Sequence, residues 1–250
     1  MKKNTLALTN MIRNVATHEV DFYRNRWGTE QEFEMLPLIS RDDFIETPLS
    51  HRRYKDQGAL VKIVHAQNAM FLSEWAFEDI AKEEWGIPSK RPMVYFTDGH
   101  EAIEKSLWCY ERGMVPLIGE KDPDIASYAA SKYEVDSLIT DESSLAKLTL
   151  YLKSRSDALQ SISIVGDVFQ PEELQQYREY AKTVRLVMRL PEIGAFAHAQ
   201  LDSSLSFRPL PLCILEEKDG TVVVTKNAPL VTPVIRFQTS IPATMVDYES

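Results

Sequence analysis

The stretch 184–194, VRLVMRLPEIG, has the pattern of a buried strand followed by a sharp exit of the chain. A single carboxylate, Glu192, lies just past the end of this predicted strand. In an open parallel sheet, ligands bind outside the carboxyl ends of the strands. Glu192 is therefore the first candidate for contact with a ligand. The alternative is a carboxylate that faces water or pairs with Arg189.

The chain ahead of this stretch alternates between short apolar runs and helical patterns. The predicted strands cover residues 93–97, 115–119, 137–139 and 161–165. The predicted helices cover residues 99–112, 122–133, 142–154 and a segment that begins at Pro171. Strands that alternate with helices of this length indicate a parallel sheet with right-handed crossovers, and near-continuous apolar runs suit strands covered on both faces. We therefore predict an α/β fold with a parallel sheet flanked by helices.

Apolar residues at helical spacing predict two further helices nearer the start of the chain. The first covers residues 4–26, and the second covers residues 67–85, where glycine and proline end it. Between them, Ser40 is a candidate N-cap. Acidic residues follow Ser40, in the first turn of a short helix, where the helix dipole favours negative charge.

The end of the chain has a different pattern, with several prolines that break helices. LPLCILEE and TVVVT are separated by Asp219-Gly220, the strongest short-range signal for a hairpin in the sequence. A further strand is predicted over residues 233–239. We expect three parts in the chain: an N-terminal helical segment over residues 1–90, an α/β sheet subdomain over 91–199 and a small C-terminal β subdomain over 200–250.

The composition is that of an ordinary globular protein. Of 250 residues, 44% are hydrophobic and 26% are charged. The net charge of −9 at pH 7 gives no support to binding of nucleic acid or of an anionic membrane surface. No stretch has the pattern of a secretory signal or of a membrane span. Cys109 and Cys213 lie in no CxxC pair, which predicts two reduced thiols in a cytoplasmic protein.

Other polar clusters have both a structural and a functional interpretation. The basic run from His51 to Lys55 is a solvated face or, because guanidinium groups match phosphate geometry, an anion-binding loop. The segment Asp98–Glu101 follows a predicted strand and is either a helix start or part of a site. The five histidines lie at no spacing typical of metal ligands, so the sequence predicts no metal centre from them.

Several segments resemble, in order, motifs of the adenylate-forming (AMP-binding) superfamily, nearest to the phenylacetate–CoA ligase type. DFYRNRWG and LPLISRDDF resemble the N-terminal segments of that group, and SISIVGDVFQPEEL resembles its strand that ends in a Gly-Glu pair before a helix. PEIG resembles the end of the Tyr-Gly-x-Thr-Glu motif, and TPVIRFQTS resembles the PLIRYRTGD segment. Because the order and intervals are those of the family over most of the chain, the resemblance implies the fold of the family's N-terminal domain.

The resemblance also implies a chemistry. In that family an acyl carboxylate attacks the α-phosphate of ATP to give an acyl-adenylate and pyrophosphate, and a thiol such as coenzyme A then takes the acyl group. Glu192 matches the family glutamate that helps to hold magnesium and nucleotide. Gly166 matches the glycine of the adenine-side turn, with Asp167 in place of glutamate, and Arg236 and Thr239 match the arginine and threonine of the RYRTGD segment. The implied ligands are ATP or AMP with magnesium and an acyl group, with less support for coenzyme A.

The chain departs from the family at the positions that bind the phosphates and the ribose of the nucleotide. ETPLSHRRYKDQG stands in place of the Gly- and Ser/Thr-rich phosphate loop, so the loop region is degenerate. Met188, Arg189 and Pro191 replace the Tyr, Gly and Thr of the glutamate motif, and the ribose-binding aspartate falls on Ile241. From the resemblance, we expect the family's C-terminal lid, with its catalytic lysine, to be absent. Because phosphates need donors or a cation to replace lost water, these departures predict weakened chemistry.

Three functions remain open from the sequence. The first, which we take as the prediction, is a degenerate adenylate-forming domain that binds an acyl or adenine-nucleotide ligand without complete ligase activity on its own, with a partner chain that supplies the lid. The second is an active carboxylate-adenylating ligase in which Arg52, Arg53 and Arg189 replace the phosphate loop and Glu192 holds magnesium. The third is a non-catalytic protein-interaction domain on the same fold.

Overall fold

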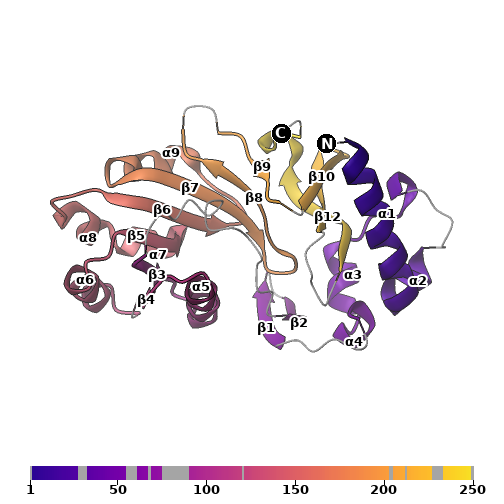
Figure 1. The fold of residues 1–250 in the computed structure, drawn as a ribbon, viewed down its shortest axis with the longest axis horizontal. Helices are drawn as coiled ribbons and strands as arrows, with labels where there is room; N and C mark the ends of the chain where they lie inside the picture. The colour runs from indigo at the N-terminus through magenta and orange to yellow at the C-terminus, as the bar shows by residue number, and fades with distance from the viewer. Residues whose placement is uncertain are drawn as a thin grey trace. The chain divides into compact units, whose positions relative to one another are not determined.

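The computed structural model describes residues 2–27, 33–54, 61–66, 69–74, 90–119, 121–202, 205–211, 213–226 and 233–248 (Figure 1). The chain divides into two compact units. The first consists of Met1–Asp79, Leu190–Phe196 and Pro209–Ser250, and the second consists of Ile80–Arg189 and Ala197–Arg208. Within the described ranges, no helix combines the length and apolarity that crossing a membrane requires.

The second unit is built on a mostly parallel sheet. Its strands are β3 (Pro92–Tyr95), β4 (Leu117–Ile118), β5 (Ser137–Asp141), β6 (Leu159–Gly166) and β7 (Ala181–Leu190). They lie in the order β4-β3-β5-β6-β7, and each neighbouring pair is parallel. Leu138 in the centre faces Met93 on one side and Ile162 on the other, and all three side chains are buried. The predicted α/β fold is therefore confirmed.

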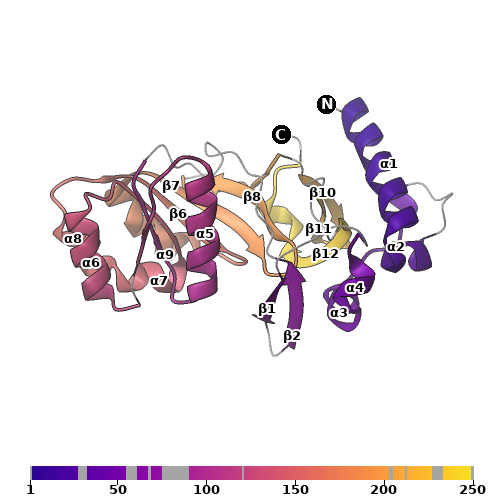
Figure 2. The same cartoon turned by 60° about the horizontal axis from the view of Figure 1, so that its bottom comes forward.

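Helices flank this sheet (Figures 1 and 2). α5 (Gly99–Glu111) packs on β3 and β4, and α7 (Glu142–Lys147) packs on β5 and β6. The other helices of this unit are α6 (Pro123–Lys132), α8 (Thr149–Ser154), α9 (Pro171–Leu174) and the 3-10 turn Gln175–Glu179. Asp98, Asp122 and Asp141 cap the N-termini of α5, α6 and α7, because each carboxylate accepts a hydrogen bond from a first-turn backbone N–H. For Asp98, this is the structural role that the sequence left open.

Two features of this unit differ from the predicted pattern. The helix expected over residues 142–154 is interrupted at Leu148, which ends α7 and precedes α8. The stretch 184–189 is also not the last strand of the sheet, because β8 (Gly194–Gln200) and β9 (Arg208–Pro209) extend the strand order beyond β7. β8 was not predicted because Pro191–Ile193 was interpreted as the point where the chain leaves the sheet beside a ligand. The structure shows a turn there that leads into another strand.

The first unit contains a three-stranded antiparallel sheet of β10 (Cys213–Lys218), β11 (Thr221–Lys226) and β12 (Val234–Pro242). The predicted hairpin is confirmed. Asp219 and Gly220 have φ angles of 52° and 76°, the positive values that a tight two-residue turn requires. This sheet is the small β structure expected near the C-terminus.

Helices and aromatic side chains complete the first unit. α1 (Lys2–Glu19), α2 (Asp21–Arg26), the 3-10 turn Phe33–Met35, α3 (Arg41–Glu46) and α4 (Leu49–Arg52) follow one another. Ser40 caps α3 in a capping box with Asp43, as its position in the sequence predicted. Phe44 of α3 packs edge-on against Phe237 of β12, with 5.2 Å between the ring centroids. The backbone N–H of Ile39 also donates to the carbonyl of Arg236 at 2.9 Å, so the start of α3 is tied to β12.

The helix predicted over residues 67–85 is wrong where the structure describes it. Ala69–Glu74 is strand β2, which pairs antiparallel with β1 (Val61–Ala66), and residues 75–89 lie outside the described ranges. A short apolar run fits the spacing of a helix and that of a strand equally well. A neighbouring segment rich in β-branched residues, with which the run can pair, favours the strand. Val61, Ile63 and Val64 on β1 provide such a partner.

Candidate functional site

Glu192 lies where the sequence predicted, in the turn directly after β7, but its side chain is only 1% exposed. It forms an ion pair with Arg41, the first residue of α3. Arg41 is itself 27% exposed at its side chain. The Arg41–Glu192 pair thus joins the start of a capped helix to the turn after a strand. A carboxylate in this setting already has a cation beside it.

Arg189, the last residue of β7 that belongs to the second unit, takes part in a separate ionic cluster. Its guanidinium lies 2.5 Å from Glu101 and 3.4 Å from Glu104, both on α5. Lys105 lies 3.5 Å from Glu104, and both side chains of that pair are buried. The four groups carry two positive and two negative charges. Arg189 therefore fixes α5 to β7 through charge-assisted hydrogen bonds.

Arg236 is buried in β12 and has a φ angle of 51°, a left-handed conformation that is unusual outside glycine. The register of β11 and β12 shifts at this point, between Val224 and Lys226, which is the mark of a β-bulge. The guanidinium donates to the carbonyl oxygens of Leu36 at 2.5 Å and of Glu34 at 2.7 Å, and its Nε lies 3.4 Å from Glu216. Arg236 thus binds the loop before α3 to the β-sheet.

Thr239 also has a partner within its own sheet. Its hydroxyl donates to the carbonyl oxygen of Val222 at 2.7 Å and accepts a hydrogen bond from the backbone N–H of Ile241 at 3.1 Å. The side chain is buried. In this structure the threonine links β12 to β11 through the carbonyl of Val222.

Gly166 and Asp167 follow β6, where the resemblance placed an adenine-side turn. A Cβ atom at Gly166 would lie 3.2 Å from the ring of Phe169, so the absence of a side chain lets that ring approach. Phe169 stacks on Phe207 with 5.6 Å between centroids. Asp167 is exposed and accepts a hydrogen bond from the backbone N–H of Val168 at 2.9 Å. The turn therefore exposes the carboxylate of Asp167, whereas the ring of Phe169 is buried.

Among the described residues of the basic run, Arg52 is buried. Arg52 donates from Nε to the carbonyl of Thr47 at 2.9 Å, and its guanidinium lies over the ring of Phe44, 5.0 Å from the centroid. It therefore packs into the first unit rather than forming part of a solvated face. Arg53 is partly exposed, and Lys55 lies outside the described residues.

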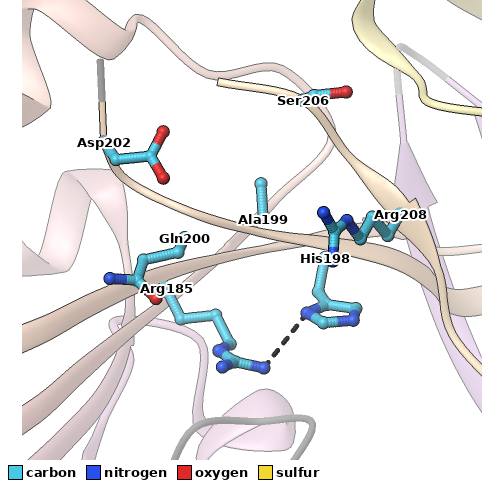
Figure 3. A pocket seen from close by; sticks show the side chains of 7 residues that line it. All are labelled: Arg185, His198, Ala199, Gln200, Asp202, Ser206 and Arg208. Atoms are coloured by element: carbon cyan, nitrogen blue, oxygen red, sulfur yellow. Dashed lines mark hydrogen bonds between the residues drawn. The ribbon is translucent and has the colours of Figure 1, made fainter. Parts of the chain in front are cut away.

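The second unit also contains a polar pocket that the sequence did not reveal (Figure 3). It has a volume of about 370 Å³ and is lined by Arg185, His198, Ala199, Gln200, Asp202, Ser206 and Arg208. The signal that could have found it is polar residues at alternate positions in otherwise apolar strands, since Arg185 lies in VRLVM and His198 in AFAHAQ. Among the described residues, no group of three or more histidine, cysteine or acidic side chains could hold a metal ion.

The protonation state of His198 follows from its neighbour. A guanidinium nitrogen of Arg185 lies 3.1 Å from Nδ1 of His198. Because arginine can only donate, Nδ1 accepts, and the neutral ring carries its proton on Nε2. Burial, with the charges of Arg185 and Arg208, lowers the pKa of His198 from 6.5 to about 4. The imidazole is therefore neutral near neutral pH.

We expect His198 to make the free energy of unfolding increase as the pH rises from 4 to 6.5. In this window the unfolded chain binds a proton that the folded chain does not bind, so stability rises with pH and levels off above 6.5. The ring is partly exposed, and solvent screening reduces the expected change to about 1–2 kcal/mol. Urea unfolding of the wild type and of His198→Gln across this range measures it. Parallel stability curves for the two proteins would contradict the assignment.

Comparison with known proteins gives structural matches only. No protein-family model and no curated protein sequence matches the chain. The amide bond synthetase McbA from Marinactinospora thermotolerans matches with a TM-score of 0.52 and 16% identity over 80% of this chain and 45% of that chain. The nonribosomal peptide synthetase FmoA3 matches with a TM-score of 0.53 and 12% identity over 86% of this chain and 25% of that chain.

A third match is a double mutant of o-succinylbenzoate CoA synthetase (MenE) from Bacillus subtilis, solved with its product analogue OSB-NCoA. Its TM-score is 0.50, with 14% identity over 77% of this chain and 44% of that chain. At these identities the likeness shows the fold alone. The fold resembles part of adenylate-forming ligases, and the chain spans less than half the length of each of these three structures.

Proposed function

We propose that this chain is a degenerate adenylate-forming domain, of the phenylacetate–CoA ligase type, that binds an acyl or adenine-nucleotide ligand without completing ligase chemistry. The fold likeness supports the scaffold. The observation that carries the loss of chemistry is the ion pair between the buried carboxylate of Glu192 and the partly exposed Arg41. The exposed carboxylate of Asp167 supports a remaining contact surface at the adenine-side turn.

The ion pair weakens Glu192 as a ligand of magnesium. Magnesium in such sites is held by one or two carboxylates together with the phosphates of its nucleotide. To bind it, Glu192 would have to leave Arg41 inside a buried environment, and breaking such a pair costs about 3–5 kcal/mol. That loss corresponds to a roughly 10²–10⁴-fold weaker affinity. We therefore propose that nucleotide binding here does not depend on magnesium.

The described residues that matched the family motif on β12 support the same conclusion. Arg236 donates to backbone carbonyls, and the hydroxyl of Thr239 donates to Val222, so both side chains stabilise their own unit. The alternative of a rearranged active site relied on Arg52, Arg53 and Arg189. Arg52 packs on Phe44, and Arg189 pairs with acidic residues of α5, which disfavours both as replacements for a phosphate loop.

A thermal-shift titration with ATP, AMP and coenzyme A, each with and without magnesium, tests ligand binding. A ligand at ~100 times its dissociation constant adds roughly 2.7 kcal/mol to the free energy of unfolding, enough to shift the melting temperature. We expect ATP or AMP to raise the melting temperature equally in magnesium and in EDTA. The absence of a shift with all of these ligands and with a panel of carboxylic acids would overturn ligand binding and favour a protein-interaction domain.

A pyrophosphate-release assay with ATP, magnesium and the same carboxylic acids tests the loss of chemistry. We expect no release above the protein-free background. Release that depends on an added acid and is lost in Glu192→Gln would show an active ligase and overturn the proposal. Thr140→Val, a buried strand substitution at a position that no motif matches, controls for general loss of folding.

A further inference from the structure

The pocket in the second unit is built by three neighbouring strands. Arg185 lies on β7, His198 and Gln200 lie on β8, and Arg208 lies on β9. Figure 3 shows both guanidinium groups near the His198 ring. Arg185 lies 3.1 Å from Nδ1 of that ring, and Arg208 lines the same pocket. Strands hold side chains more precisely than loops do, so this arrangement is a suitable frame for a small ligand.

The charges and donors of the pocket match a carboxylate. The neutral ring of His198 adds a single donor, Nε2–H, to the donors of Arg185 and Arg208. With Asp202, the lining carries two positive charges and one negative charge, a net charge of +1. One carboxylate neutralises that charge, whereas a phosphate dianion would leave an excess of negative charge beside Asp202. Guanidinium forks also fit carboxylate geometry in a bidentate manner.

The rest of the lining is polar. Gln200, Asp202 and Ser206 offer donors and acceptors, and Ala199 is the apolar member of the lining. This environment suits hydroxyl or amino groups rather than a hydrocarbon chain. A volume of about 370 Å³ is sufficient for a small molecule with a few heavy atoms beyond its carboxylate.

We propose that this pocket binds a small hydroxy- or amino-carboxylate, whose carboxylate lies between Arg185 and Arg208. The site goes beyond the nucleotide function proposed above. Arg185 precedes Arg189 by four positions on β7, about 13 Å along an extended strand, so the pocket lies away from the carboxyl end of β7 at which Arg189 stands. The binding of a carboxylate here and the binding of a nucleotide can therefore fail independently.

Ligand-observed NMR and calorimetry with lactate, L-serine and gluconate test the site, with lactamide as the matched probe that lacks the carboxylate. We expect saturable binding of at least one carboxylate and none of lactamide. Arg208 is exposed, so Arg208→Gln should fold normally, and we expect it to weaken binding about 10-fold or more. Arg185→Lys keeps the charge but loses the fork, and should weaken binding as well.

Arg178→Gln is the matched control, because Arg178 is an exposed arginine of the same unit that is not part of the pocket lining. Its affinity for the carboxylate should equal that of the wild type. The proposal is overturned if none of the three acids binds, if lactamide binds equally well, or if neither pocket variant changes the affinity. Tighter binding of inorganic phosphate than of any carboxylate would also overturn it, and would reassign the pocket to phosphate groups.

Discussion

Replacing Arg41 with methionine should lower the free energy of unfolding by about 3–5 kcal/mol, because it removes the guanidinium that pairs with the buried carboxylate of Glu192. The side chain of Glu192 is 1% exposed, so water cannot replace the guanidinium. Methionine keeps most of the length and apolar stem of arginine, which limits the loss from packing. Chemical unfolding of the wild type and of Arg41→Met, followed by circular dichroism, measures the difference.

Two further variants separate the ion pair from the general effect of losing an arginine. Arg26 pairs with Asp43 near the surface of the same unit, and Arg26→Met should cost no more than about 1 kcal/mol. Arg41→Met combined with Glu192→Leu removes both charges and should recover most of the stability, since apolar replacement of a buried pair is often neutral. Equal losses for Arg41→Met and Arg26→Met would show that the burial of Glu192 has no energetic role.

The same variants bear on the proposed function. If Arg41 prevents Glu192 from holding magnesium, Arg41→Met is the variant in which a magnesium-dependent nucleotide shift is expected to emerge. Such a shift in the variant, and not in the wild type, would indicate that the ion pair suppresses an ancestral site. A magnesium-dependent shift already in the wild type would contradict this role of the pair.

The parts of the fold that the sequence predicted are those in which local pattern and tertiary structure agree. The parallel strands are continuous apolar runs between capped helices, and the hairpin at Asp219-Gly220 has a turn that few other sequences can form. The strands β1 and β2 were predicted wrongly because their apolar residues fit a helix equally well until a pairing partner is known. Local signals alone could not make that choice.

The candidate site was predictable only in part. The position of Glu192 after a strand follows from the sequence, but its partner Arg41 lies on a distant segment, and no pattern links the two. The same is true of Arg236, whose acceptors are backbone carbonyls near α3. The pocket around His198 depends on β8 and β9, which the sequence did not reveal as part of the sheet. Long-range pairing of polar groups is therefore what the sequence could not supply.

Replacing Arg236 with methionine should also lower the free energy of unfolding, by about 4 kcal/mol, because buried carbonyl groups lose charge-assisted donors. The guanidinium serves Leu36 and Glu34 together, and Nε faces Glu216. An arginine at a positive φ costs roughly 1–2 kcal/mol that these contacts help to offset, and methionine at the same position keeps that cost without them. Chemical unfolding of the variant beside the wild type measures the loss.

The loss in Arg236→Met should depend on pH, and this dependence separates the guanidinium from simple packing. Burial raises the pKa of Glu216, and Arg236 opposes that rise, so the pKa should climb further in the variant. A raised carboxylate pKa destabilises the fold as pH increases through it, so the deficit in stability should be larger near pH 8 than near pH 5.

Arg236→Lys keeps the charge but not the fork, and should lose about half as much stability with little pH dependence. Arg24→Met, which removes an exposed arginine, should stay within about 1 kcal/mol of the wild type at both pH values. A deficit of the same size in Arg236→Met at both pH values would mean that the side chain acts through packing alone.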